Sequence, residues 1–299
     1  MVKGSMDLID TERAIELYRG LPDAVEMSGG SAANTMCGVA SFGGRAAYIG
    51  KVHTDELGAV FDHDLRAVGV HFHAGDPGAD LPTGRCIIVV TPDAERTMNT
   101  YLGASSMLAP IDLDEDLIAA GALLYMEGYL YDRPEAKQAF RRAAEVAHEA
   151  DRQVSLTLSD SFCVDRHRSD FVDLVSDEVD ILFGNESELI ALYETSSFDE
   201  AVAEVRRHCP LTVATVGASG SLIITPDEVT EVPARPVPEV VDTTGAGDMF
   251  AAGFLHGLAQ GRSHSGAAQW GSIAAAEIIS HVGPRPLVPL STLVHKSAS

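Results

Sequence analysis

The chain has 299 residues, of which 45% are hydrophobic, enough to bury a core as one large domain or a domain with a small attachment. Its 44 acidic residues outnumber the 21 basic ones, and the net charge of −23 disfavours binding to nucleic acid or to an anionic membrane. The four cysteines are scattered without a Cys-x-x-Cys pair, and no apolar run is long enough to span a bilayer, so we expect a cytoplasmic protein with reduced thiols.

The first informative stretch is a glycine-rich loop that runs from Ser28 to Thr35. Gly30 permits a close approach of the backbone to a ligand, while Ser31 and Asn34 can exchange directional hydrogen bonds with hydroxyl groups. These features suit a sugar-binding loop. Taken alone, the stretch fits better an ordinary helix entry with Ser31 as its N-cap.

A β-rich segment follows between Gly75 and Met107. It contains two strand patterns, Cys86–Thr91 and Arg96–Tyr101, which we interpret as part of a small sheet that acts as a lid. Arg96 in this sheet is placed to reach a substrate or a phosphate, although an exposed lid arginine is the simpler interpretation.

The remainder of the chain alternates short apolar strands with helical patterns. Strands are expected at residues 122–126, 154–158, 180–183, 212–216 and 221–225, and helices at 134–150, 186–193, 199–208, 246–259 and 265–279. This alternation predicts an α/β fold, in which a mostly parallel sheet carries helices on both faces. Ligands in such folds bind beyond the carboxyl ends of the strands.

Asn185 and Glu188 follow the strand at 180–183 and lie on one face of the next helix. An amide and a carboxylate in this position can hold a hydrated Mg²⁺ near nucleotide phosphates. The alternative is a polar first turn, in which acidic side chains interact favourably with the helix dipole.

The last two strands are too close together for a helix to lie between them. Gly217, Ser219 and Gly220 form the connection, which has the pattern of a hairpin turn. A plain turn of this kind needs no ligand.

The segment from Val240 to Phe250 leads into the apolar helix at 246–259. Gly245 and Gly247 allow the backbone N–H groups at the start of this helix to be exposed, and its positive dipole end attracts phosphate oxygens. Asp248 lies in the first turn, where it is a candidate base for a hydroxyl group that attacks the phosphate.

Two further observations bear on this segment. Asp242 or Thr244 can cap the helix, with the glycines needed only for a tight entry turn. The chain has no Gly-x-x-x-x-Gly-Lys-Ser/Thr sequence, so it is not a P-loop enzyme, and the glycine pair is the candidate anion hole.

The sequence Asp-Thr-Thr-Gly-Ala-Gly-Asp-Met-Phe-Ala-Ala-Gly-Phe, at 242–254, resembles the C-terminal signature of the ribokinase-like (PfkB) family of sugar and nucleoside kinases. The loop at 28–35 resembles the N-terminal, substrate-binding signature of that family. Ile49–Gly58 and Gly184–Glu188 also match in order and spacing, so the resemblance covers nearly the whole chain. It implies a three-layer α/β core with a small β lid, and a kinase that uses ATP and Mg²⁺.

The resemblance also implies a role for each matching residue. The expected base is Asp248, and the expected anion hole consists of Gly245, Ala246 and Gly247. The sugar or ribose is contacted by Gly30, Ser31 and Asn34, and Mg²⁺ is held through water by Asn185 and Glu188. The residues expected to approach the nucleotide are Asn185, Gly217, Ser219, Gly220 and Thr244. In some members a monovalent cation such as K⁺ binds beside the anion hole, near Asp242 and Thr244.

By the same resemblance, residues 31–74 and 106–299 form the core, and residues 1–30 and 75–105 form the lid. Family members usually begin with a buried strand that ends near an aspartate, which clamps the sugar hydroxyls. No equivalent precedes the loop at Gly30. We therefore expect either an incomplete N-terminus or a chain weakened in stability and binding.

The leading hypothesis is an ATP-dependent kinase for a primary hydroxyl of a sugar or nucleoside. Its motif spacing resembles that of adenosine kinase and its bacterial relatives more than that of phosphofructokinase, while ribokinase, fructokinase and ketodeoxygluconate kinase activities are alternatives. A different class of function is a binding protein that keeps the nucleotide site and has lost turnover. The partner is a small molecule in each case, and the chain is a monomer or a homodimer paired through its lid sheet.

Overall fold

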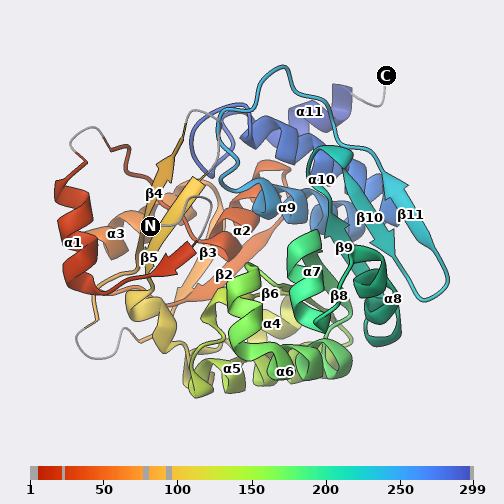
Figure 1. The fold of residues 1–299 in the computed structure, drawn as a ribbon. Helices are drawn as coiled ribbons and strands as arrows, with labels where there is room; N and C mark the ends of the chain where they lie inside the picture. The colour runs from red at the N-terminus through yellow and green to blue at the C-terminus, as the bar shows by residue number, and fades with distance from the viewer. Residues whose placement is uncertain (1–5, 22–23, 77–80, 92–95, 297–299) are drawn as a thin grey trace.

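A six-stranded sheet forms the centre of the computed structural model, which describes residues 6–21, 24–76, 81–91 and 96–296 (Figure 1). The strand order is β11-β10-β9-β8-β7-β6. Four strands are parallel, namely β6 (Leu123–Glu127), β7 (Gln153–Thr157), β8 (Ile181–Asn185) and β9 (Leu211–Thr215), whereas β10 (Ser221–Ile224) and β11 (Val229–Val232) are antiparallel. The predicted α/β fold with a mostly parallel sheet is confirmed.

Helices cover both faces of this sheet because successive strand residues point to opposite sides. Leu182 packs into a core with α5 (Pro134–Glu149), α6 (Ser161–Asp177), α7 (Glu186–Tyr193) and α8 (Phe198–His208). Its neighbours Ile181 and Phe183 pack into a second core with α9 (Ala246–Ala259) and α10 (His264–Ile278). In Figure 1 the first group of helices lies on one side of the sheet and the second group on the other.

The strands and helices predicted for the last two thirds of the chain are present, with bounds that differ by at most two residues. The hairpin is confirmed as well, because the short helix η4 (Gly217–Ser219) joins the antiparallel β9 and β10. Among the described residues of this part of the chain, the elements that the sequence patterns missed include α4 (Glu115–Ala120), α6 and β11.

Two smaller sheets are built from the N-terminal third. In the first, β1 (Met6–Leu8) runs parallel to β5 (Arg96–Tyr101), which pairs antiparallel with β4 (Arg85–Val90), and α1 (Thr11–Arg19) packs beside them. In the second, β2 (Ala46–Gly50) pairs parallel with β3 (Val70–Ala74), across the helix α3 (Glu56–Ala67). Residues 1–5, 22–23, 77–80 and 92–95 of the predicted lid lie outside the described residues, and the division into core and lid stays a prediction.

A buried ion pair lies where the chain leaves and re-enters the small sheet of β1, β5 and β4. Lys51 Nζ is 2.8 Å from Asp112 Oδ2 and donates to the carbonyl of Met107 at 3.2 Å. The two side chains are only 7% and 1% exposed. Gly75 packs against the same carboxylate, since a Cβ there would lie 2.7 Å from Asp112 Oδ1.

Short helices complete the connections: η1 (Gly103–Met107), η2 (Pro110–Asp112) and η3 (Gly128–Leu130), with α11 (Leu290–Lys296) near the C-terminus. Within the described ranges, no helix has the length and apolar character needed to cross a membrane.

The helix α2 (Ser31–Ser41) crosses α9 at close range (Figure 1). Gly38 makes this crossing possible, because a Cβ at that position would lie 2.5 Å from the Cβ of Ala252 and 3.0 Å from Met249 Sδ. The crossing brings the N-termini of the two helices together, and with them the two sequence signatures.

Candidate active site

A partly buried carboxylate, Asp248, joins the starts of α2 and α9. Its Oδ1 accepts a hydrogen bond from Ser31 Oγ at 2.8 Å, and its Oδ2 accepts one from Asn34 Nδ2 at 2.8 Å. Burial raises the pKa of Asp248, while the hydrogen bonds from Asn34 and Ser31 favour its charged form. The structure thus brings the predicted base into direct contact with two predicted substrate-binding residues.

Gly30 occupies the N-cap position of α2 with φ of 91°, a conformation that favours glycine. No side chain caps this helix start. The simpler interpretation of the loop, with Ser31 as the N-cap, is therefore wrong: Ser31 is the first helical residue and its hydroxyl is directed to Asp248.

A second carboxylate, Glu127, lies at the end of β6 and was missed by the sequence patterns. Its Oε2 accepts a hydrogen bond from the backbone N–H of Ala32 at 2.8 Å, at the start of α2. Its pKa is raised to about 7, mainly by burial and to a smaller extent by the negative charge of Asp248, against the opposing effect of that hydrogen bond. Two carboxylates and two helix N-termini therefore share one site, where the positive ends of the helices stabilise the negative charges.

The raised pKa of Glu127 predicts a dependence of stability on pH. In the folded protein the carboxyl group of Glu127 stays protonated up to a pH of about 7. In the unfolded chain it loses its proton at a pH of about 4.5, the ordinary pKa of the group. The contribution of protonated Glu127 to the free energy of unfolding is therefore fully present below pH of about 4.5 and is lost as the pH rises to about 7. We expect the Tm of Glu127→Gln, measured relative to the Tm of the wild type, to rise by about 2–4 °C as the pH is raised from 5 to 8.

Thermal unfolding of both proteins across this pH range measures the effect. Glu231→Gln is the matched control, since Glu231 is exposed on β11. A Tm difference between Glu127→Gln and wild type that stays constant with pH would contradict the prediction.

The residues predicted to form an anion hole lie at the start of α9. Gly245 is the N-cap with φ of 80°, and it is buried against Pro284, whose Cα would lie 3.0 Å from a Cβ on Gly245. Gly247 is exposed, and a Cβ there would meet nothing within 4 Å. The Ala246 N–H already donates to the carbonyl of Thr243 at 3.2 Å. Gly247 is thus the member of the trio that faces open space.

Asp242 and Thr244 form a buried turn before this helix and do not cap it, because Gly245 is the N-cap. Asp242 Oδ1 accepts bonds from the Thr244 N–H at 2.9 Å and from Thr244 Oγ1 at 2.7 Å. Burial disfavours the charged form of Asp242, but these bonds and one from the Gly283 N–H outweigh it and lower its pKa. The hydroxyl of Thr244, predicted to approach a nucleotide, is directed to Asp242.

Asn185 and Glu188 form a reciprocal cap at the start of α7. Asn185 Oδ1 accepts from the Glu188 N–H at 2.9 Å, and Glu188 Oε2 accepts from the Asn185 N–H at 2.9 Å. Burial raises the pKa of Glu188 to about 7, and the charge of Asp160 adds to this effect. A desolvated carboxylate beside a second acid suits a hard cation with oxygen ligands such as Mg²⁺. Among the described residues, no group of three or more His, Cys, Asp and Glu is arranged to hold a metal.

The predicted nucleotide turn presents its first residues to solvent. Gly217 and Ser219 are exposed in η4, and a Cβ on Gly217 would meet nothing within 4 Å. Gly220 differs, because it is buried with φ of 105° and a Cβ there would lie 2.1 Å from the carbonyl oxygen of Val232. Packing against the strand β11 accounts for Gly220 without a ligand.

Arg96 opens β5 and is half-buried, not exposed as its simpler interpretation expected. Its positive charge lowers the pKa of Asp248 and of Asp242 against the effect of burial, and it acts on Glu188 in the same sense. Arg96 therefore lies close enough to the candidate site for its charge to act on three of the carboxyl groups there.

The sequence patterns missed two charged residues of the site. Glu127 directly follows the strand predicted at 122–126, so the rule that drew attention to Asn185 also applies to it. Arg285 lies in a loop beyond α10 and donates from Nε to Asn34 Oδ1 at 3.0 Å. No local pattern in the sequence marks Arg285.

An α/β sheet with an open helix N-terminus and a partly buried carboxylate at its carboxyl edge suits a phosphotransferase that acts on a hydroxyl group. The comparison with known families agrees with this class. Residues 4–290 match the family described as pfkB family carbohydrate kinase, and the chain belongs to that family.

Solved and characterised relatives include both nucleoside and sugar kinases. The crystal structure of adenosine kinase from Sinorhizobium meliloti is 49% identical with a TM-score of 0.95, and the match covers 99% of this chain and 91% of that one. The probable sugar kinase from Rhizobium etli CFN 42 is 47% identical with a TM-score of 0.96, over 100% and 91% of the two chains. Adenosine kinase of Saccharomyces cerevisiae is 28% identical over 281 residues, which cover 88% of this chain and 81% of the relative.

Proposed function

We propose that this protein is an ATP-dependent kinase that transfers the γ-phosphoryl group to a primary hydroxyl of a nucleoside, with an adenosine-like nucleoside as the substrate. The observation that carries the proposal is the contact of Asp248 with both Ser31 and Asn34. It places a desolvated base at the residues suited to hold a hydroxylated substrate.

The chemistry follows from the parts of the site. The substrate hydroxyl attacks the γ-phosphorus, its proton passes to Asp248, and the bond from phosphorus to the bridging oxygen of ADP breaks. The backbone at Gly245 and Gly247 and the dipole of α9 stabilise the charge on the transferring group. The carboxyl group of Glu127, which contacts the N–H of Ala32 next to Ser31, accepts a further hydrogen bond from a substrate hydroxyl.

The nucleotide phosphates extend from α9 toward the ends of β8 and β9. Mg²⁺, when bound through water near Asn185 and Glu188, would neutralise phosphate charge. Arg96 supplies a further positive charge from the small sheet, which suits a lid that closes over the phosphates. Gly217 and Ser219 offer exposed backbone for the nucleotide. A monovalent cation such as K⁺ has a candidate carboxylate in Asp242.

The nucleoside is favoured because the Sinorhizobium meliloti relative is an adenosine kinase. The second candidate is a sugar such as ribose, fructose or ketodeoxygluconate, since the relative from Rhizobium etli is described as a sugar kinase at nearly the same identity.

Purified protein incubated with ATP, Mg²⁺ and each of adenosine, ribose, fructose and ketodeoxygluconate tests the proposal. We expect ADP release with adenosine, and AMP as the second product by mass spectrometry. Turnover with a sugar alone would replace the nucleoside by that sugar. ATP binding without turnover of any acceptor would support a binding protein and overturn the kinase proposal.

A further inference from the structure

The loop between α10 and α11, residues 279–289, touches three parts of the candidate site at once. The N–H of Gly283 donates to Asp242 Oδ2 at 3.0 Å, in the turn before the anion hole. Pro284 packs against Gly245, the N-cap of α9. Arg285 then donates from Nε to Asn34 Oδ1 at 3.0 Å. We refer to residues 279–289 as the buttress loop.

The buttress loop is itself held in place near both ends. The N–H of Val241 donates to the carbonyl of Ile279 at 2.8 Å, and the N–H of Leu287 donates to Glu277 Oε1 at 2.9 Å. Gly283 has φ of 104°, which favours glycine and directs the next residues back toward the site. Arg285 therefore projects from a fixed backbone.

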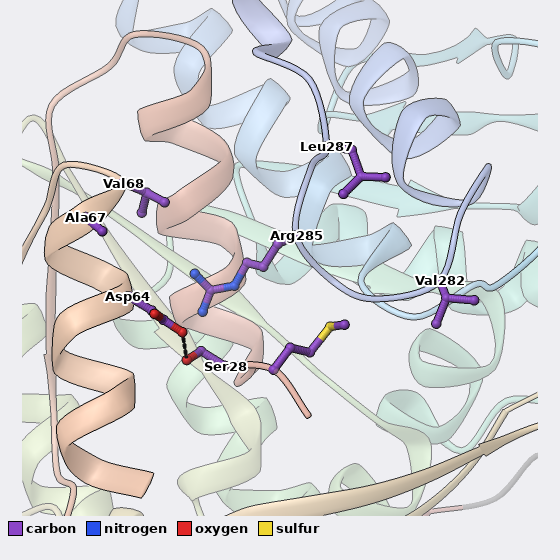
Figure 2. Close-up of a pocket in the computed structure, with 8 residues that line it drawn as sticks. Ser28, Asp64, Ala67, Val68, Val282, Arg285 and Leu287 are labelled. Carbon is purple, nitrogen blue, oxygen red and sulfur yellow. Dashed lines mark hydrogen bonds between the residues drawn. The ribbon is translucent and has the colours of Figure 1, made fainter. Parts of the chain in front are cut away.

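Figure 2 shows the side chain of Arg285 extending from the buttress loop toward Ser28 and Asp64. These residues line a pocket of about 270 Å³. Ser28 Oγ donates to Asp64 Oδ2 at 2.5 Å. Another nitrogen of the guanidinium, Nη1, contacts the Sγ of Cys37, one turn along α2 from Asn34. The arginine is thus directed against the same helix that carries the substrate loop.

The chemistry of the guanidinium decides how the amide of Asn34 is oriented. An arginine side chain donates hydrogen bonds and accepts none, so its Nε–H requires the oxygen of the amide. With Oδ1 held by Arg285, the amide nitrogen faces Asp248 and donates to Oδ2 at 2.8 Å. The reversed amide has nearly the same shape, but it would place its oxygen against the carboxylate oxygen of Asp248.

We infer that Arg285 is a positioning residue for phosphoryl transfer, acting through Asn34 to hold the carboxylate of Asp248 in one orientation. The inference rests on the proposed function of Asp248 as the base. With Arg285 in place, one donor serves each carboxylate oxygen, Ser31 on Oδ1 and Asn34 on Oδ2. The carboxylate plane is then fixed relative to the start of α9, where the phosphoryl group is transferred.

Replacement of Arg285 by Met keeps most of the unbranched, apolar stem of the side chain and removes every donor. We expect Arg285→Met to lower kcat about 10- to 100-fold, the effect of a small misplacement of a reacting group, with the KM for ATP changed less than about 3-fold. Arg285→Lys should recover part of the rate, because an ammonium group can still donate to Asn34 Oδ1. Arg207→Met, at an exposed pair with Glu204, is the control and should match wild type.

A double-mutant cycle separates positioning from a general structural role. If Arg285 acts through Asn34, then adding Arg285→Met to Asn34→Ala should change kcat less than about 2-fold. Independent, multiplicative losses in the double variant would overturn the inference, as would a wild-type kcat for Arg285→Met. If Arg285→Met folds poorly by circular dichroism, the same cycle is run with Arg285→Lys and Arg285→Gln.

A spectroscopic measurement distinguishes failure of this inference from failure of the proposed function. In ¹⁵N-labelled protein, the side-chain amide of Asn34, assigned with Asn34→Ala, should shift and exchange faster with solvent in Arg285→Met. An unchanged amide signal overturns the inference even if the wild type is an active kinase. If the amide signal changes in Arg285→Met but the wild type phosphorylates no acceptor, the contact between Arg285 and Asn34 is upheld and only the assigned reaction is overturned.

Discussion

Asp248→Asn is expected to lower kcat by about 10²- to 10⁴-fold, the range for loss of a general base. Asparagine has the shape of aspartate, but its amide cannot accept the proton of the attacking hydroxyl. The KM for ATP should change less than about 3-fold, since the base does not hold the nucleotide in this mechanism.

The surroundings of Asp248 allow Asp248→Asn to remove the base without disturbing the local hydrogen bonds. An asparagine can turn its oxygen toward Asn34 Nδ2 and its nitrogen toward Ser31 Oγ, which keeps both hydrogen bonds. Because burial already disfavours the charge, the neutral side chain should leave Tm unchanged or slightly higher.

Steady-state rates of ADP release with saturating ATP and acceptor measure the effect. Asp62→Asn is the matched control, because Asp62 pairs with Arg66 on the exposed side of α3 and should give a wild-type rate. A near-normal kcat for Asp248→Asn would show that another group accepts the proton.

Lys51→Met is expected to destabilise the protein by about 3–5 kcal/mol, the cost of removing one partner from a buried ion pair. The carboxylate of Asp112 would then lie 1% exposed without its countercharge. Its remaining bond is with the N–H of Ala109, at 2.9 Å. In a protein of this size, the loss corresponds to a fall in Tm of at least about 6 °C.

Urea unfolding and thermal unfolding measure this loss. Lys137→Met is the matched control, because Lys137 and Asp170 are 25% and 44% exposed, and such a pair contributes about 0–1 kcal/mol. The double variant Lys51→Met/Asp112→Leu should recover much of the loss, since neither charge is then left buried alone. Equal costs for Lys51→Met and Lys137→Met would refute the prediction.

The effect of Asp248→Asn would appear in the rate and that of Lys51→Met in the stability, because the two residues occupy different parts of the fold. Asp248 lies at the proposed transfer site, so its replacement is expected to lower the rate without unfolding the protein. Lys51 and Asp112 lie where the small sheet of β1, β5 and β4 joins the rest of the chain, next to Gly75 and Met107. Loss of that pair lowers stability, and at the assay temperature it also loosens the candidate lid.

The sequence by itself determined the architecture and the main parts of the candidate site. Strands such as Ile181–Asn185 and helices such as Ala246–Ala259 follow from local hydrophobic patterns, which depend only on neighbouring residues. Gly30 indicated a close approach of the backbone to a ligand and Gly245 indicated an exposed helix start, and both glycines have positive φ in the structure. Asp248 was identified because it stands beside such a start.

Only the tertiary structure decided how these parts work together. The contact of Asn34 with Asp248 depends on the close crossing of α2 and α9 at Gly38, between residues far apart in the chain. Glu127 meets the N–H of Ala32 only after β6 is placed beside α2. Arg285 orients Asn34 from a loop that no local pattern marks. Local patterns record the preferences of the backbone, whereas the direction of a side-chain hydrogen bond depends on partners brought together by packing.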